Sequence, residues 1–279
     1  MIGGGFIKES FFLHHMDAYE VARELSRYRD NVGRRDFIER LARDLALSLG
    51  YRLILQDIDV DPKYGNRNFI LDSGHDNPLL NTAHYDGYVI DEATGETTPG
   101  ANDNGSGIGA VVQALQQLKG LPVDVVFFGA EEADSLGAKQ YIAQMTKKIR
   151  AVVNLDTCGS GGKLGMLIPD SVEVGPELRQ IDAKLNAHYL ASAESFGIKI
   201  CGHDPLAIGD HCNFIEAGIP ATTIQGEDLE YYGMEDEKYI DGKGVMHTAK
   251  DTIEEVDREF LQQVVLVLIA GSKRLLGGE

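Results

Sequence analysis

Histidine and carboxylate residues recur in this sequence where short apolar runs end. They lie in the segments "AHYD", "GAEE" and "NLD", and more of them lie in "PGANDNGSG" and "MHTAKDT". Histidine nitrogens and carboxylate oxygens are the ligands that Zn²⁺ and similar divalent ions use in proteins. The residues that could bind a metal or support its ligands are His84, Asp86, Asp103, Glu131, Glu132, Asp156 and His247.

The number of candidate ligands exceeds what one tetrahedral zinc ion needs. Two histidines and three carboxylates can instead hold two ions about 3.5–4 Å apart if one carboxylate bridges them. Each residue also has a simpler explanation: Asp103 fits a helix cap or an Asx-turn, and Glu131 and Glu132 fit a solvated loop. Their joint placement at one edge of the predicted sheet favours the metal site, because ligands bind outside the carboxyl ends of parallel strands.

The glycine-rich segment around Asp103 has two phosphate-binding interpretations. "GSGIGA" at 105–110 fits the G-x-G-x-x-A pattern of dinucleotide-binding folds, but that pattern directly follows an apolar strand. Here it follows the polar segment "DEATGETTPGANDN". A P-loop needs a Gly-Lys-Ser/Thr ending, which this segment lacks. Both interpretations therefore fail on context.

The stretches between these polar residues alternate between strand-like and helix-like patterns. This alternation predicts an α/β fold, a three-layer α/β/α sandwich with a mixed, largely parallel central sheet. We expect a single domain over 1–279, with a helical segment, 1–50, packed on it, and a long loop at 226–246. The expected strands are 51–60, 68–73, 78–86, 123–132, 150–156 and 220–225, and the expected helices are 17–50, 106–120, 135–145, 177–197 and 252–276.

Composition excludes some classes of partner. The net charge is −18 and no cluster of lysine and arginine is present, which argues against nucleic acid and anionic membrane surfaces as partners. No apolar stretch reaches the length of about 18 residues that spans a membrane. The first residues lack the features of a signal peptide, and three cysteines are an odd number, so we expect free thiols and a cytoplasmic location.

Six segments in one order resemble the co-catalytic, di-zinc aminopeptidase family, which includes bacterial leucyl aminopeptidases and has relatives among glutamate carboxypeptidases and glutaminyl cyclases. They are "HYD", "PGANDNGSG", "FFGAEEADSLGAKQYI", "AVVNLD", "GDHCNFIEAGIPA" and "HTAKDT". The resemblance extends from about His84 to Asp257. It implies a phosphorylase/hydrolase-like, zinc-peptidase-like catalytic domain that holds two divalent ions, with Zn²⁺ the expected metal.

The resemblance also implies a role for each matching residue. His84 and Asp156 would bind one metal, Glu132 and His247 the other, and Asp103 would bridge both. Glu131 would be the general base, which takes a proton from water and gives it to the departing amine. The family tends to have a cis peptide after the bridging aspartate, here Asp103–Asn104, and Ser106 or Asn104 would then cap the helix that follows.

Other residues are expected around this centre. Asp86 lies two residues from His84 on the same strand face and is placed to hydrogen-bond a ring nitrogen, and Asp251 is a similar candidate near His247. The family commonly has an aromatic residue before the last histidine, where this chain has Met246. The remaining candidates for stabilising the intermediate or contacting substrate are Tyr231, Tyr232 and Asp210.

The expected activity is that of an aminopeptidase acting on a peptide or small amide. The segment 227–241 holds seven acids, which suits a substrate with a free α-ammonium group but also suits a solvated loop. A glutaminyl-peptide cyclotransferase is an alternative, although such enzymes usually place tryptophans in the pocket and this chain has none. A dimetal carboxypeptidase or amidohydrolase on a small metabolite stays open, and a scaffolding relative is disfavoured because the ligand positions are filled. Side-chain preference and oligomeric state do not follow from the sequence.

Overall fold

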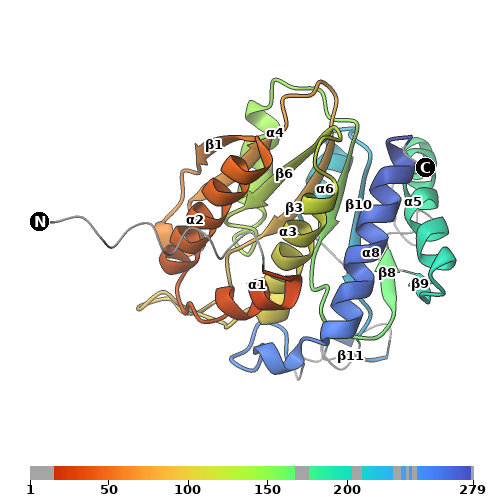
Figure 1. Ribbon diagram of the computed structural model, residues 1–279. Helices are drawn as coiled ribbons and strands as arrows, with labels where there is room; N and C mark the ends of the chain where they lie inside the picture. The colour runs from red at the N-terminus through yellow and green to blue at the C-terminus, as the bar shows by residue number, and fades with distance from the viewer. Residues whose placement is uncertain are drawn as a thin grey trace, which may run out of the picture.

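A central sheet of eight strands forms the middle layer of the protein (Figure 1). The computed structural model describes residues 16–166, 176–202, 209–228, 234–236, 239–240 and 244–277. In spatial order the strands are β1 (Arg52–Asp57), β2 (Arg67–Asp72), β6 (Val123–Phe128), β3 (Leu79–His84), β7 (Ala151–Leu155), β10 (Ala221–Gly226), β8 (Leu164–Met166) and β9 (Ile200–Gly202).

The four strands at the centre of this sheet run parallel. β3 pairs in parallel with β6 and β7, and β10 pairs in parallel with β7. The antiparallel pairs lie towards the edges, where β2 pairs with β1 and β6, and β8 pairs with β10. Every residue of β3, β6, β7 and β10 is buried, as expected for parallel strands covered on both faces.

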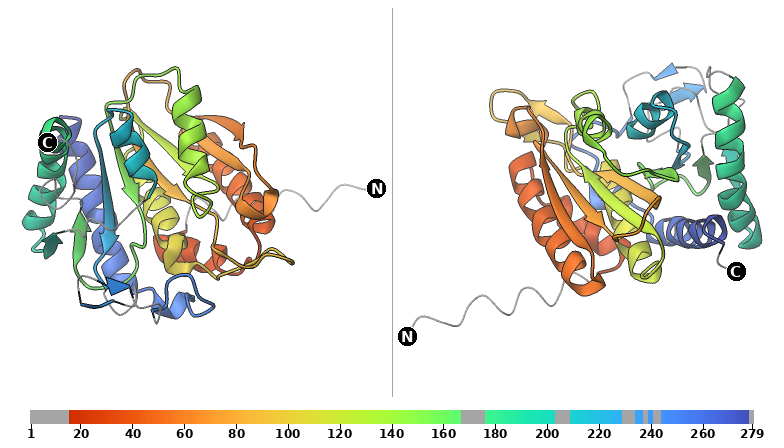
Figure 2. Two further views of the ribbon diagram at one scale, coloured as in Figure 1. Left: turned by 180° about the vertical axis from the view of Figure 1, so that it is seen from behind. Right: turned by 90° about the horizontal axis from the view of Figure 1, so that it is seen from above.

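Helices cover both faces of the sheet (Figure 2). On one face lie α1 (Ala18–Leu25), α2 (Asn31–Leu49), α3 (Gly107–Gln117) and α8 (Arg258–Leu275), with α5 (Pro176–Ser195) against α8. On the other face lie α4 (Leu136–Gln144) and α6 (Asp210–Glu216). The predicted three-layer α/β/α sandwich with a mixed, largely parallel sheet is therefore confirmed.

Alternation along the strands divides the apolar side chains between the two layers. In β6, Val125 and Phe127 belong to the larger core beneath α1, α2, α3 and α8, whereas Val126 and Phe128 belong to the smaller core beneath α4 and α6. Successive side chains of a strand point to opposite faces, which produces this division. The buried strands hold the sheet rigid, so the loops that follow β3, β6 and β7 begin from fixed positions.

Two of the predicted helices have different boundaries. The expected helical segment 17–50 consists of two helices, because Asp17 forms a capping box with Glu20 for α1 and Asp30 caps α2 separately. The expected helix 252–276 begins only at Arg258, where Asp257 accepts hydrogen bonds from the first backbone N–H groups. The preceding residues form a short 3₁₀ turn, Ile253–Glu255.

Several short elements were not predicted. β8 and β9 are three residues each, and the hairpins β4 (Val89–Asp91) with β5 (Glu96–Thr97), and β11 (Met234–Asp236) with β12 (Tyr239–Ile240), are equally short. The second hairpin lies in the expected loop 226–246. A 3₁₀ turn, Pro62–Tyr64, also precedes β2. Across the part of the chain that the structure describes, no helix has both the length and the apolar character needed to cross a lipid bilayer.

Candidate metal centre

The carboxyl ends of β3, β6 and β7 bring the predicted metal ligands together. His84 is the last residue of β3, and Asp156 directly follows β7. Because β3 lies in parallel between β6 and β7, the loops after these strands open at the same edge of the sheet. Two groups of side chains have ligand atoms close enough to hold a metal ion: His84, Asp103 and Asp156, and Asp103, Glu132 and His247.

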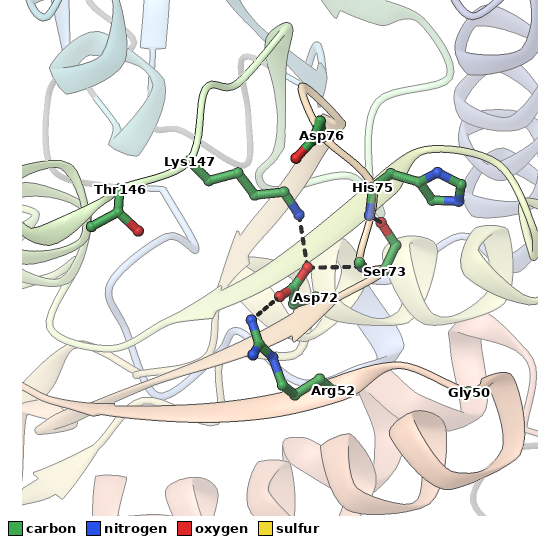
Figure 3. A pocket seen from close by; sticks show the side chains of 9 residues that line it. Gly50, Arg52, Asp72, Ser73, His75, Asp76, Thr146 and Lys147 are labelled. Atoms are coloured by element: carbon green, nitrogen blue, oxygen red, sulfur yellow. Dashed lines mark hydrogen bonds and ion pairs between the residues drawn. The ribbon is translucent and has the colours of Figure 1, made fainter.

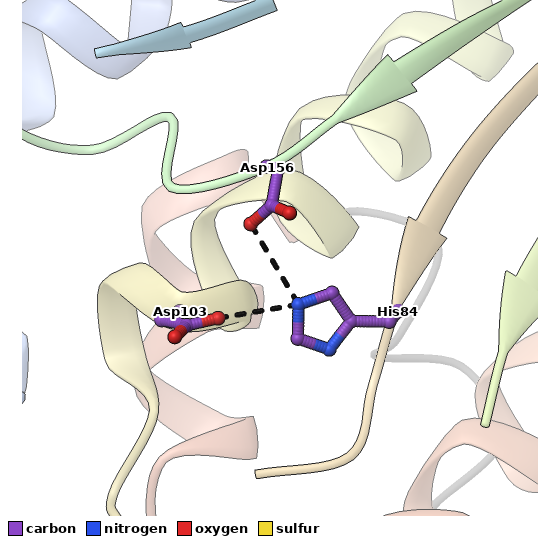
Figure 4. A group of neighbouring side chains, drawn as sticks. All are labelled: His84, Asp103 and Asp156. Carbon is purple, nitrogen blue, oxygen red and sulfur yellow. Dashed lines mark ion pairs between the residues drawn. The ribbon is translucent and has the colours of Figure 1, made fainter. Parts of the chain in front are cut away.

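The first group surrounds Nε2 of His84 (Figure 4). This nitrogen lies 3.2 Å from Oδ1 of Asp103 and 3.6 Å from Oδ1 of Asp156. Oε2 of Glu131 lies 4.0 Å from the same nitrogen, beside the group rather than within it. Because its other ring nitrogen, Nδ1, lies 3.1 Å from the main-chain oxygen of Asp86, Nε2 of His84 points into the group.

The second group surrounds Nε2 of His247. This nitrogen lies 3.3 Å from Oδ2 of Asp103 and 3.2 Å from Oε2 of Glu132. The two oxygens of Asp103 therefore face different histidines, which is the geometry that a bridging carboxylate requires.

Asp103 owes this orientation to the helical turn Ala101–Ser106, labelled η3. Its backbone leaves helical geometry at Asp103 and Asn104, and the peptide bond between them is cis, as the family resemblance implied. The side chain of Asn104 accepts a hydrogen bond from the N–H of Gly107 at 3.0 Å and donates one to the carbonyl of Leu155 at 2.8 Å. Asn104 thus caps α3, so that Asp103 faces the strand ends instead.

Two buried carboxylates hold the backbone around the ligands. Asp86 accepts hydrogen bonds from the N–H groups of Glu131 at 3.2 Å and Glu132 at 3.0 Å. Its Oδ1 lies 3.6 Å from Nδ1 of His84, too far for a hydrogen bond, so the predicted contact with the ring is made by the main-chain oxygen of Asp86. Asp251 accepts hydrogen bonds from the N–H groups of Asn102 at 2.9 Å and Asp103 at 3.0 Å.

Burial and crowding shift the pKa values of the acids in the cluster. Burial, together with the repulsion of neighbouring carboxylates, raises the pKa of Glu132 to about 7 and that of Glu131 well above its usual range. Burial would lower the pKa of His247, but its hydrogen bonds with Asp103 and Glu132 raise it to about 11. The cluster therefore concentrates negative charge in a place where water cannot stabilise it.

The donor set fits a divalent cation. Oε1 of Glu132 is buried, and no hydrogen-bond partner for it exists among the described residues. Buried polar atoms normally have partners, and an orphaned carboxylate oxygen beside two histidines indicates a cation as the missing partner. A divalent ion in each group would also offset the repulsion that raises the pKa values of Glu131 and Glu132.

Of the remaining predicted site residues, Asp210 lies near the cluster, and the two tyrosines are outside the part of the chain that the structure describes. Asp210, the first residue of α6, is fully buried. Burial, with the nearby charges of Asp86 and Asp156, raises the pKa of Asp210 to about 8, so it lies close to the cluster. Tyr231 and Tyr232 lie outside the described residues.

Two further residues contact the site that the sequence interpretation did not include. Arg34 of α2 is fully buried, and its guanidinium donates hydrogen bonds to the carbonyls of Tyr85, Thr98 and Pro99. The sequence does contain a signal for Arg34: it lies four positions before Ile38, on the helix face that also carries Ile38 and other buried apolar residues. The second residue, Tyr88, stacks on the ring of His247, and the sequence contains no comparable signal for it.

A pocket at the opposite end of the sheet does not share this character (Figure 3). It lies where β2 ends, and its lining includes Arg52, Asp72 and Lys147. Nζ of Lys147 lies 2.7 Å from Asp72 and 2.8 Å from Asp124, and Arg52 also pairs with Asp72. Because these cations are already paired with carboxylates, we assign the function to the acidic cluster.

Comparison with known proteins identifies the family. The model for peptidase family M28 matches residues 69–271, which is most of the chain. The chain belongs to peptidase family M28. The M28 match includes every residue of the two candidate ligand groups and confirms the family that the motifs resembled.

Individual relatives of this M28 chain agree with the family. It is 29% identical over 202 residues to aminopeptidase YwaD of Bacillus subtilis, a match that covers 68% of this chain and 39% of YwaD. BSAP, a zinc aminopeptidase from B. subtilis, superimposes with a TM-score of 0.59 at 25% identity over 76% of this chain and 50% of that one. Glutaminyl cyclase of Porphyromonas gingivalis superimposes with a TM-score of 0.69 over 93% of this chain and 97% of that one, but at 21% identity this likeness concerns the fold alone.

Proposed function

We propose that this M28 protein is a metal-dependent exopeptidase, an aminopeptidase that hydrolyses the N-terminal peptide bond of a peptide or small amide. The observation that carries the proposal is the position of Asp103, whose two oxygens face two separate histidine and carboxylate groups. Such an arrangement is what a pair of metal ions needs. The names of the aminopeptidase relatives support the same activity.

In this proposal the ligand sets are those expected from the family resemblance. His84 and Asp156 hold one ion, Glu132 and His247 hold the other, and Asp103 bridges them. We propose Zn²⁺ at both positions, because nitrogen and oxygen donors suit it and BSAP is a zinc aminopeptidase. When bound, a pair of zinc ions supplies Lewis acidity, which lowers the pKa of water and polarises a carbonyl group.

The chain itself supplies the proton transfer. Glu131 lies beside the first group without occupying it, so its carboxylate is left to accept a proton from the attacking water. Burial raises the pKa of Glu131, which helps it to keep that proton until the amine departs. The hydrogen bond from its N–H to Asp86 fixes the backbone from which Glu131 projects.

Gly209 leaves room beside the proposed general base. A Cβ atom at this position would lie 3.5 Å from Oδ2 of Asp156 and 3.7 Å from Oε1 of Glu131. The main chain before α6 therefore borders the space between these two carboxylates. We propose that the scissile bond enters this space and that Asp210, the next residue, contacts the substrate or the groups that hold it.

Glu131→Gln tests the proposal. Purified protein should contain about two zinc ions per chain and release the amine from aminoacyl anilides, and a chelator should abolish that release. Glu131→Gln should retain the metal but lose about 10²–10⁴-fold in kcat, which is the usual contribution of a general base. Asp134→Asn, at an exposed position three residues further along, is the matched control and should behave as wild type.

The outcomes separate the proposal from its alternatives. Absence of bound metal, or undiminished activity in Glu131→Gln, would overturn it. Cyclisation of an N-terminal glutamine, or release of a C-terminal residue, in the same substrate panel would replace the aminopeptidase activity with one of the other reactions. A single catalytic unit over 1–279 and a cytoplasmic location stay predictions.

A further inference from the structure

The ring of Tyr88 stacks on the ring of His247. Their centroids are 4.4 Å apart and their planes differ by 8°. Tyr88 is 39% exposed as a whole residue and the side chain of His247 is 39% exposed, so the pair lies at the solvent-facing side of the cluster. The stack covers one face of His247, whose Nε2 lies close to Asp103 and Glu132.

The two histidines of the cluster are held in different ways. His84 is almost fully buried, and its Nδ1 lies 3.1 Å from the main-chain oxygen of Asp86. A hydrogen bond to the ring nitrogen that does not bind metal normally fixes the orientation of a histidine ligand. His247 has no such bond, since within the described ranges no residue is a hydrogen-bond partner of its Nδ1. Besides the approach of Nε2 to Asp103 and Glu132, the stack with Tyr88 is therefore the contact among the described residues that restricts its ring.

The backbone of His247 does not restrict the ring by itself. His247 has a φ of 60°, in the left-handed region that non-glycine residues seldom occupy, and it lies in a turn where Thr248 bonds back to Val245. The turn sets where the side chain begins. Rotation about the bonds of the side chain would still move Nε2 away from Asp103 and Glu132.

The backbone of Tyr88, in contrast, is held firmly. The preceding residue, Gly87, exchanges two hydrogen bonds with the side chain of Asn31, at 2.8 and 3.0 Å. The carbonyl of Tyr88 accepts a hydrogen bond from the N–H of Thr98 at 2.9 Å. A Cβ atom at Gly87 would lie 2.9 Å from the guanidinium carbon of Arg34, so the chain passes closely over a buried side chain. Tyr88 can therefore act as a fixed wall for the ring of His247.

We propose that Tyr88 is a positioning residue that holds Nε2 of His247 towards the second metal position. The segment "HYDGY" would then orient both histidines, His84 through the carbonyl of Asp86 and His247 through the ring of Tyr88. The inference rests on the dimetal centre proposed above. It predicts that loss of the ring weakens the metal position of Asp103, Glu132 and His247 and leaves the position of His84, Asp103 and Asp156 unchanged.

The experiment is a Zn²⁺ titration of metal-free protein against a chromophoric chelator. Wild type should bind two equivalents. Aromatic stacks change an equilibrium constant by about 2- to 10-fold, so Tyr88→Ala should bind one equivalent as wild type does and the other up to about 10-fold more weakly. Tyr88→Phe keeps the ring and should stay within about 2-fold of wild type. Ile90→Ala, at an equally exposed position on the same hairpin, is the matched control and should also match wild type.

Each other result overturns the role of the stack. Wild-type affinity at both positions in Tyr88→Ala would show that the ring does not position His247. Equal weakening in Tyr88→Phe would assign the effect to the hydroxyl group, and equal weakening in Ile90→Ala would assign it to the hairpin. Failure of wild type to bind two equivalents would instead refute the dimetal centre itself, so the two hypotheses fail in distinguishable ways.

Discussion

Replacement of Asp86 by asparagine should loosen the loop that carries Glu131 and Glu132. The carboxylate of Asp86 is fully buried and accepts both backbone N–H groups. The side chain of asparagine keeps one oxygen that can accept a hydrogen bond from one of these backbone N–H groups, but it places an NH₂ group, which is a donor, opposite the other backbone N–H. One hydrogen bond to a charged group, worth about 1.5–3 kcal/mol, is lost, and a buried N–H without a partner costs about 1–3 kcal/mol.

One effect opposes this loss. The negative charge of Asp86 raises the pKa of Asp210, and its removal relieves that repulsion. We therefore expect the free energy of unfolding of Asp86→Asn to fall by about 2–5 kcal/mol in the metal-free protein. Because Glu132 is a proposed metal ligand, the affinity for metal should also fall by about 10- to 100-fold, as is usual when a group that supports a ligand is removed.

Urea unfolding in the presence of chelator measures the first quantity, and Zn²⁺ titration measures the second. Asp134→Asn is the control for both, because its side chain is exposed and its ion pair with Lys139 is on the surface. An Asp86→Asn protein with wild-type stability and wild-type metal affinity would refute the reasoning. It would mean that the two hydrogen bonds do not hold the loop.

Two predictions concern pH. Burial raises the pKa of Glu132 to about 7, and the neighbouring carboxylates raise the pKa of His247 to about 11, so both groups bind more protons in the folded state than in the unfolded state. The metal-free protein should therefore lose stability as the pH rises from about 5 to 8. Thermal unfolding in the presence of chelator measures this, and an unfolding midpoint that stays level or rises over that range would contradict it. Burial opposes the shift at Asp72, but hydrogen bonds from Lys147, Gly74 and Arg52 lower its pKa to about 2. The ionised Asp72 should therefore contribute about 2 kcal/mol to the free energy of unfolding above pH ~4, and this contribution should be lost as the pH falls to ~2. In Asp72→Asn the free energy of unfolding in urea should depend less steeply on pH over that range. A pH dependence equal to that of wild type would reject the assignment.

The sheet was predictable where the strands are long and buried. Runs such as 123–132 and 150–156 are apolar throughout and end in acids, which identifies both the strand and its functional end. β8 and β9 were not predictable, because three residues carry too little periodicity and their pairing with β10 and with each other depends on contacts distant in sequence. The sequence indicated that 17–50 is helical but did not place the break between α1 and α2, because Asp30 could equally be a surface residue within a helix.

The clustering of the candidate ligands was predictable from the sequence, and the contacts around them were less so. The residue types and their order in the sequence indicate metal binding, and the parallel strands place these residues at one edge of the sheet. The hydrogen-bond partner of His84 was assigned to the right residue but the wrong atom, because a two-residue spacing cannot separate the carboxylate of Asp86 from its carbonyl. The stack of Tyr88 on His247 joins residues that are 159 positions apart in the sequence, and no local pattern predicts it.

Arg34 connects the N-terminal helices to the chemistry of the centre. It lies in α2, before the segment that matches the M28 family, and burial lowers its pKa only to about 10, so it keeps its charge at neutral pH. Its described hydrogen bonds go to main-chain carbonyls, which support the loops next to Asp86 and Asp103 without neutralising the charge. The carboxylates of Asp251, Asp86, Asp103 and Glu132 all raise the pKa of Arg34, and the attraction is mutual. A fixed positive charge behind the cluster therefore offsets part of the negative charge of these acids, and α2 takes part in the site although it contributes no proposed ligand.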